Sequence, residues 1–512
     1  MTLARFGRRL ALGVGLVGVV GAAFCGCGGG GGSSNNNTGG NRGAFIAPGT
    51  TPFVNTNIGS RAACQANAHV NGRARWTVLV YLNSASNLQP DSLINVAQMA
   101  SVGSNANLNI IVQWKQTATS NYFSAVSVST TPSFIGTRRY KISKHSQSDL
   151  NRIAPPGIDT NPNLIGDTTV LDADRLPDPP TNTINDGSQK TSDMGDYRTL
   201  ADFVQWGTKN YPADYMALVI WDHGSGALPV INRSAHSSTV SRTFRSISGA
   251  KTPARAVSQD VQTGSQIATQ EIPLALANPA QPIDALIVDC SLQGTAEMAY
   301  DARHSARVYV GSEESPPGTG YPYDTWLNFL QNNTATTCDC GQELINATIA
   351  LYPDQSNITQ SMTDLSKMDA VATAINAFGG SLHTYAPTLI TQIQTARQSA
   401  QYFDFPEYKD LYSFADLIRT TTGVPTDLAT AAGNVETSLL GTNGAILAAS
   451  HGAAQDTTGF SEAQASGLSI FLPGPQTQSS VDNTVGFDPA WNQLGLGKAA
   501  PNWAAFLQAE VQ

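Results

Sequence analysis

The chain has 512 residues, and 41% of them are hydrophobic, which is enough for a substantial core. Charged residues make up only 13%, and the net charge of −9 is spread without long runs of one sign. A nucleic-acid-binding protein needs clustered lysine and arginine to neutralise phosphates, so this composition excludes nucleic acid as a partner.

The N-terminus has the pattern of an export signal. Three arginines in the first nine residues precede an apolar stretch that is too short for a comfortable membrane span. The stretch ends in FCGC, which predicts a lipoprotein signal peptide over 1–27 with Cys27 as the lipid attachment residue; Cys25, or an ordinary cleaved signal, is the alternative. A Gly/Ser/Asn-rich tether follows over 28–72. The predicted localisation is therefore that of an exported, bacterial, membrane-anchored lipoprotein, facing the periplasm or on the cell surface.

Strands and helices alternate from about residue 73 to residue 340. Apolar runs predict strands, and segments with apolar residues at helical spacing predict helices between them. This order predicts an α/β domain with a mostly parallel sheet flanked by helices, whose functional groups lie beyond the carboxyl ends of the strands. The expected strands are 76–82, 107–114, 215–222, 283–289 and 308–314, and the expected helices are 92–103, 197–212, 268–278 and 295–305.

The segment 145–190 is rich in Pro, Asn and Asp and shows no periodicity, so it is interpreted as a surface insertion. The remaining portion, 341–512, is predicted to be mainly helical. It ends in a final strand pair, formed by the apolar runs at 444–452 and 467–473.

The cysteines suit a disulfide better than a metal. An exported protein can form disulfides, and Cys64 can pair with Cys338 or Cys340, a choice that the sequence leaves open. The seven histidines are scattered without the spacing of metal ligands, so no metal site is predicted.

Candidate catalytic groups follow two of the predicted strands. His223 precedes a Gly-rich turn, and ALIVDCSLQG at 285–294 ends in an acid, a cysteine and a serine. A histidine beside a nucleophile is the arrangement needed to activate a thiol or hydroxyl and to protonate a leaving amine. The structural alternatives are that His223 is a capped strand-end residue, and that Asp289 or Ser291 caps the helix at 294–305.

Several segments together resemble the clostripain-like cysteine peptidases, which have a caspase-like fold. They occur in the family's order and include WTVLVYL, TRRY, MGDYRTLADFVQWGTKNYPADYMALVIWDHGSG, IDALIVDCSLQGTAEMAYDAR, VYVGSEESPPGTGYPY, DLYSFADL and GLSIFLP. The resemblance implies that 73–340 is a caspase-like peptidase domain acting on a peptide or protein substrate. It implies that His223 is the catalytic histidine and that Asp289 lies at the base of a pocket that favours Arg or Lys before the cut bond. No cofactor is expected, although some members respond to calcium, which makes calcium a candidate ligand.

The chain departs from the family at the nucleophile. The family reads D-A-C-L-M-G where this chain reads Asp289-Cys290-Ser291-Leu292-Gln293-Gly294, so Ser291 holds the nucleophile's position. Since successive strand residues face opposite ways, Asp289 and Ser291 are expected on one face and Cys290 in the packing behind it. In the first strand's loop, Ala85 and Ser86 stand where the family tends to carry an Asp-Asn pair.

Two functions remain open from the sequence. The first is an endopeptidase that uses His223 with Ser291 or Cys290 as nucleophile, the backbone N–H of Gly224 and of the nucleophile residue serving as oxyanion donors. The alternative is a non-catalytic pseudoenzyme with the same fold, which binds basic peptides or a surface partner. Whether the chain is an enzyme depends on the residue at the nucleophile position.

Overall fold

The structure is a computed structural model that describes residues 53–118, 131–161, 163–180, 184–186, 189–227, 257–260, 262–332, 334–353, 358–452, 461–474 and 489–510. The predicted signal peptide, Cys25, Cys27 and the first part of the tether lie outside these residues. Within them, no helix combines the length and the apolar character needed to cross a membrane.

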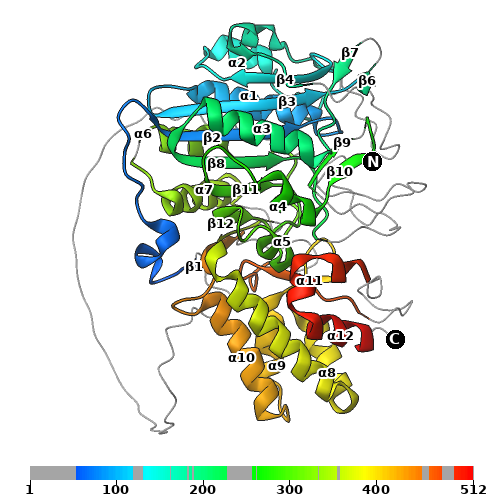
Figure 1. Ribbon diagram of the computed structural model, residues 1–512. Helices are drawn as coiled ribbons and strands as arrows, with labels where there is room; N and C mark the ends of the chain where they lie inside the picture. The colour runs from blue at the N-terminus through cyan, green and yellow to red at the C-terminus, as the bar shows by residue number, and fades with distance from the viewer. Residues whose placement is uncertain are drawn as a thin grey trace, which may run out of the picture. The chain divides into compact units, whose positions relative to one another are not determined.

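A large sheet organises the described residues, with ten strands in it (Figure 1). Its five central strands, β12, β11, β8, β2 and β3, are mutually parallel, and the pairs on both flanks are antiparallel. This confirms the predicted fold class. In order across the sheet the strands are β1 (Phe53–Val54), β15 (Ile446–His451), β13 (Thr359–Asp364), β12 (Ala306–Gly311), β11 (Ile283–Asp289), β8 (Ala213–Trp221), β2 (Ala74–Asn83), β3 (Leu108–Gln116), β4 (Gly136–Lys141) and β5 (Arg175–Leu176).

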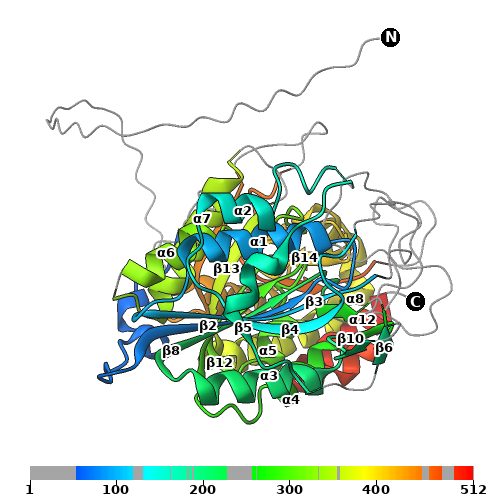
Figure 2. The same cartoon turned by 90° about the horizontal axis from the view of Figure 1, so that it is seen from above.

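Helices cover both faces of this sheet (Figure 2). The central strands are apolar on both sides: in β2, Val78 and Val80 contribute to one core, while Leu79 and Tyr81 contribute to the other. The first core is covered by α1 (Gln89–Val102), α2 (Gln147–Ile153), α6 (Tyr323–Asn332) and α7 (Thr337–Leu351). The second is covered by α3 (Tyr197–Asn210), α4 (Ile272–Ala275) and α5 (Ala296–Asp301), together with the C-terminal helices.

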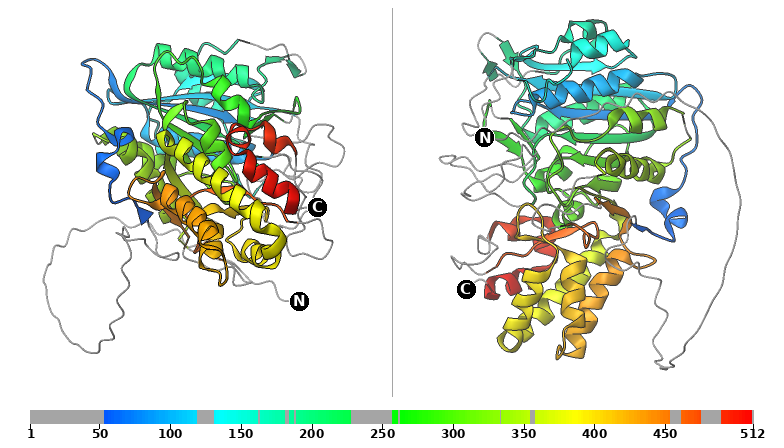
Figure 3. Two further views of the ribbon diagram at one scale, coloured as in Figure 1. Left: turned by 60° about the horizontal axis from the view of Figure 1, so that its bottom comes forward. Right: turned by 180° about the vertical axis from the view of Figure 1, so that it is seen from behind.

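The C-terminal portion is mainly helical, as predicted. Figure 3 shows its helices packed against one another, and α8 contacts α9, α10 and α12. Helix α8 bends where Pro387 interrupts it and Leu389 leaves helical geometry. The bounds are α8 (Met368–Ser399), α9 (Leu411–Thr420), α10 (Thr426–Leu440), α11 (Gly495–Ala499) and α12 (Pro501–Glu510).

The prediction of a final strand pair is wrong. Strand β15 joins the large sheet between β1 and β13, whereas β16 (Ser469–Phe471) pairs with β14 (Tyr408–Asp410). Backbone hydrogen bonding explains the separation, because the Ser469 N–H donates to the Gly294 carbonyl at 2.9 Å and so holds β16 beside the turn that precedes α5. Since β13 and β15 share a sheet with the earlier strands, the division at residue 340 runs through one sheet, and the domain bounds themselves stay a prediction.

Short elements account for the other differences. The segment 145–190 contains α2, β5 and β6 (Ile184–Asp186), which pairs with β7 (Gln189–Thr191), so it is not the structureless insertion expected from its lack of periodicity. Elements of two to seven residues are too short to show a period. The remaining elements are β9 (Val257–Asp260), β10 (Ser265–Ile267) and 3-10 turns at Ile58–Ser60, Ala62–Cys64, Thr168–Asp174, Thr269–Glu271, Leu365–Lys367 and Pro489–Gln493.

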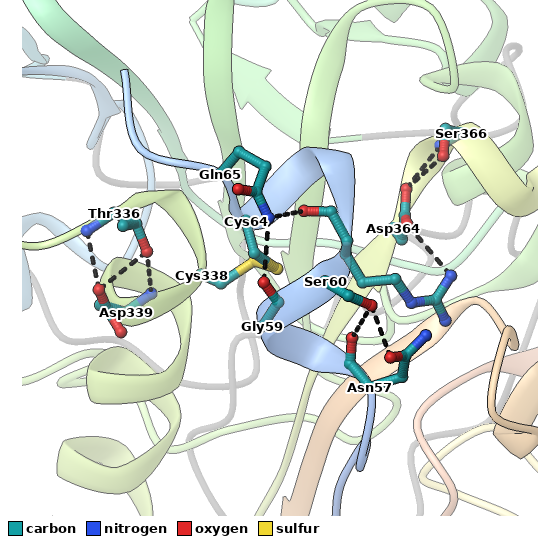
Figure 4. Close-up of a disulfide and its surroundings, with 11 residues drawn as sticks. Asn57, Gly59, Ser60, Cys64, Gln65, Thr336, Cys338, Asp339, Asp364 and Ser366 are labelled. Carbon is teal, nitrogen blue, oxygen red and sulfur yellow. Dashed lines mark hydrogen bonds and ion pairs between the residues drawn. A yellow bond between two sulfur atoms is a disulfide. The ribbon is translucent and has the colours of Figure 1, made fainter. Parts of the chain in front are cut away.

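A disulfide joins the first described segment to α7. Cys64 bonds to Cys338, with Cα atoms 5.0 Å apart and 274 positions between them in the chain (Figure 4). The structure thereby selects one of the two pairings that the sequence leaves open. Cys340 is a buried free thiol, and burial raises its pKa. Nearby, Asp339 completes a capping box with Thr336 at the start of α7.

Candidate active site

Three loops meet at one edge of the sheet because the strands before them end in register. Leu82 of β2 pairs with Trp221 of β8, and Trp221 pairs with Asp289 of β11. The carboxyl ends of these parallel strands therefore lie side by side, and the loops that begin at residues 84, 222 and 290 leave the same edge. The sequence-predicted residues His223, Asp289 and Ser291 all lie at this edge.

His223 is buried, with 2% of its surface exposed, at the end of β8. Its ring nitrogen Nε2 lies 2.6 Å from the side-chain oxygen Oδ1 of Asn87, in the loop after β2. Asn87 is not among the residues predicted from the sequence, because the family pattern in this loop concerns the neighbouring positions Ala85 and Ser86. The signal that could have identified Asn87 is an amide side chain directly beyond a central parallel strand.

Asp289 is fully buried and held by two tyrosines, Tyr321 just before α6 and Tyr323 at its first position. The Tyr323 hydroxyl donates to its Oδ2 at 2.9 Å, and the Tyr321 backbone N–H lies 3.4 Å from the same oxygen. Tyr321 is itself fixed, since its hydroxyl donates to the Val288 carbonyl at 3.2 Å. These contacts orient the carboxylate from the side of the sheet opposite to Cys290.

Cys290 and Ser291 follow Asp289. The Cys290 side chain points into the packing behind the strand, as strand alternation predicts. It is part of the hydrophobic core beneath α5, with Sγ 3.6 Å from the Ile220 carbonyl. Ser291 is fully buried, and its Oγ has no hydrogen-bond partner among the described residues, His223 included. The chain then turns sharply, because Leu292 has a φ of 58°, a conformation that is rare for a residue with a branched side chain.

Neither Asp289 nor Ser291 caps the following helix. The N-cap of α5 is Thr295, whose side chain accepts a hydrogen bond from the Met298 N–H at 3.1 Å. The structural alternative that the sequence offers for both residues is therefore wrong. Helix capping therefore does not explain why Asp289 and Ser291 are buried at the end of β11.

Gly224 brings the histidine loop onto the turn at Ser291. A Cβ atom placed on Gly224 would lie 2.3 Å from the Ser291 carbonyl oxygen and 3.0 Å from Cys290 Cβ, so only glycine fits at this contact. Gly224 also forms an isolated antiparallel bridge with Val257. The backbones after β8 and β11 are thus in direct contact, while the role of Gly224 as an oxyanion donor stays a prediction.

Buried acids lie beyond the end of β12, next to this turn. Burial raises the pKa of Glu313 and of Glu314 well above the ordinary value, and the nearby Asp410 raises that of Glu313 further. The Gly467 N–H donates to Glu313 at 2.9 Å, and the Ser315 N–H donates to Glu314 at 2.7 Å. These backbone contacts tie the acids to the surrounding loops.

No metal site is evident in the parts of the chain that the structure describes, where no three His, Cys, Asp or Glu side chains are grouped to hold an ion. In the segment 145–190, Asp167 accepts from the Thr169 N–H and pairs with Arg152 at 2.7 Å. Hydrogen bonds from Thr169 and Arg152 lower its pKa to about 2. Calcium as a ligand stays a prediction from the resemblance.

Comparisons with known proteins agree with the fold. The sequence profile of the clostripain family, Peptidase_C11, matches residues 173–494. The inactive zymogen of a C11 protease from Parabacteroides distasonis has a TM-score of 0.51 at 16% identity, covering 84% of this chain and 99% of that chain. A secreted C11 cysteine protease from Bacteroides thetaiotaomicron, in complex with an irreversible peptide inhibitor, has a TM-score of 0.49 at 16% identity, covering 83% and 99%. No curated protein is significantly similar to the chain.

Proposed function

Because the chain belongs to the clostripain family of peptidases, we propose that it is an endopeptidase that cleaves peptides and proteins after arginine or lysine. One observation carries this proposal: a buried imidazole, a buried carboxylate and a buried hydroxyl follow two adjacent parallel strands that end in register. They are His223 after β8, and Asp289 and Ser291 at the end of β11. Titratable groups gathered at such an edge are typical of catalytic sites.

The proposed reaction uses the hydroxyl of Ser291 as nucleophile. As it attacks the scissile carbonyl carbon, His223 takes its proton, and the N–H groups of Gly224 and Ser291 stabilise the oxyanion. His223 then gives the proton to the leaving amine, and water hydrolyses the acyl-enzyme by the same route. Cys290 is the second candidate nucleophile, but its side chain lies in the core and the turn would have to rearrange to present it.

The proposed specificity rests on Asp289. A buried carboxylate complements a guanidinium or ammonium group, and the hydrogen bond from Tyr323 holds it in one orientation. An apolar substrate side chain placed there would offer the buried acid neither a charge nor a hydrogen-bond donor, whereas a basic side chain offers both.

Export and lipid anchoring are further parts of the proposal. They rest on the signal-peptide pattern of 1–27 and on Cys27 before the Gly-rich tether. The disulfide between Cys64 and Cys338 supports export, because disulfides persist mainly in oxidising compartments. Growth with radiolabelled palmitate tests the anchor, and a Cys27→Ala protein that still incorporates label would refute Cys27 as the attachment residue.

A second candidate function is a non-catalytic homologue that binds basic peptides in the same site. The observation that favours it is the Ser291 hydroxyl, which is buried and has no hydrogen bond to His223 or to any other described residue. A hydroxyl that acts as nucleophile needs a hydrogen-bonded base during attack.

One panel of variants separates the two functions. Full-length protein is assayed on fluorogenic peptides with Arg, Lys, Leu or Glu before the cleaved bond. The peptidase predicts cleavage of the basic peptides that is lost in His223→Ala and Ser291→Ala and kept in Ser225→Ala, a matched change of a buried serine. Loss in Cys290→Ala, with activity kept in Cys340→Ala, would make the thiol the nucleophile instead. An inactive parent that gains activity as Ser291→Cys would establish the non-catalytic homologue.

A further inference from the structure

The contact between Asn87 and His223 fixes which ring nitrogen carries the proton. His223 Nε2 and Asn87 Oδ1 are 2.6 Å apart, and an amide oxygen can only accept a hydrogen bond. Nε2 must therefore be protonated in the neutral ring, which makes Nδ1 the basic nitrogen. A histidine that works as a general base requires one defined tautomer, and a third group usually sets it.

The loop that carries Asn87 is held firmly by its own side chains. The Ser84 hydroxyl donates to the Lys115 carbonyl at 2.5 Å, and the Ala85 N–H donates to Asn83 Oδ1 at 3.2 Å. Ser86 accepts from the Leu88 N–H at 3.2 Å, which closes the turn around Asn87. The position of the amide is thus set before any substrate binds.

The same loop is joined to the histidine loop at two successive positions. Ser86 Oγ lies 3.5 Å from Oδ1 of Asp222, and the next residue, Asn87, contacts His223. Because two consecutive residues of the loop after β2 contact two consecutive residues of the loop after β8, both the distance and the relative orientation of the two loops are defined. Asp222 directly precedes His223 in the chain, and none of the variants below changes it.

We propose that Asn87 is a positioning residue, which holds His223 in the Nε2–H tautomer so that Nδ1 is the atom that accepts the nucleophile's proton. When Nδ1 takes that proton, the imidazolium still donates its Nε2–H to Asn87. Because the amide is neutral, it orients the ring without adding a negative charge that would favour the protonated ring. The role in turnover rests on the proposed peptidase function, whereas the tautomer does not.

The test is the protonation state of His223, read by NMR on full-length protein labelled with ¹⁵N-histidine and assigned with a His223→Gln variant. The expected parent spectrum shows the Nε2–H tautomer. Asn87→Ala should lose this single tautomer, and Asn87→Asp should raise the pKa of His223 by about one unit, since a carboxylate at that distance favours imidazolium. Asn151→Asp, the same change on the exposed face of α2, should leave the pKa of His223 where it is.

Activity gives a second readout that a merely structural role would not move. In an active parent, Asn87→Asp should shift the acidic limb of the pH profile of kcat/KM upward by about one unit, and Asn87→Ala should lower kcat about 10-fold or more. A parent in the Nδ1–H tautomer, or an unshifted pKa in Asn87→Asp, would overturn the inference. An inactive parent with the Nε2–H tautomer and the expected pKa shift would overturn the peptidase function and uphold the role of Asn87.

Discussion

Glu297 of α5 connects the residues after the candidate nucleophile to the C-terminal part of the chain. It is fully buried, and its Oε1 accepts hydrogen bonds from the Phe471 N–H and from Trp491 Nε1, both at 2.9 Å. Its other oxygen, Oε2, has no partner among the described residues. Burial raises the pKa of Glu297 to about 7, from an ordinary value of 4.5. The substitution Glu297→Gln keeps an acceptor oxygen in place and removes the ionisation.

The raised pKa makes the free energy of unfolding depend on pH. Between pH 4.5 and 7 the folded protein holds a proton on Glu297 that the unfolded chain releases, so stability falls as the pH rises. The pKa difference corresponds to a loss of about 3 kcal/mol, which is complete once the pH is above the folded pKa. Asp301, whose pKa burial raises to about 6, acts in the same direction over a narrower range.

Urea denaturation of the parent, Glu297→Gln and Asp301→Asn between pH 4.5 and 8 tests this reasoning. Glu297→Gln should be less stable at pH 4.5, because its NH₂ group has no acceptor. Its stability should fall less toward pH 8 than that of the parent, by about 3 kcal/mol. Asp301→Asn should still show the loss of about 3 kcal/mol in the free energy of unfolding that the titration of Glu297 causes. Parallel pH curves for the parent and Glu297→Gln would refute the assignment of the raised pKa to this residue.

Three further predictions follow from single contacts. Cys64→Ala should lower the free energy of unfolding by about 3 to 5 kcal/mol, because the bond to Cys338 closes a long loop; reductant should destabilise the parent equally and the variant no further. Tyr323→Phe should cost about 2 kcal/mol in urea denaturation, because it removes the hydrogen bond to the buried Asp289, and an unchanged midpoint would contradict this. Gly226→Ala should lower Tm by several degrees, because its φ of 75° and an adjacent tyrosine ring leave no room for Cβ; a Tm within one degree of the parent would argue against that crowding.

Much of the candidate site could be predicted from local sequence. The apolar runs ending at Asp289 and before His223 identify central parallel strands, and parallel strands end at a common edge, so both residues could be placed there in advance. The burial of Cys290 followed from the two-residue period of a strand. In each case the prediction depends only on a few residues that are neighbours in the chain.

Other features depend on partners that are distant in the chain. Asn87 contacts His223 across 136 positions, and the Tyr323 hydroxyl reaches Asp289 across 34. Pairing of β16 with β14 is of the same kind, since each strand has only three residues and no pattern that names its neighbour. The spacing of apolar residues within one segment does not indicate which distant loop or strand that segment will contact.

The sequence by itself determined the alternating strands and helices and the family, because periodicity and short motifs are local properties of the chain. Only the tertiary structure decided that Cys64 pairs with Cys338, that Thr295 caps α5, and that Asn87 lies against the imidazole. Those choices depend on the register of strands and on the packing of loops, which place atoms far apart in the chain within hydrogen-bonding or bonding distance.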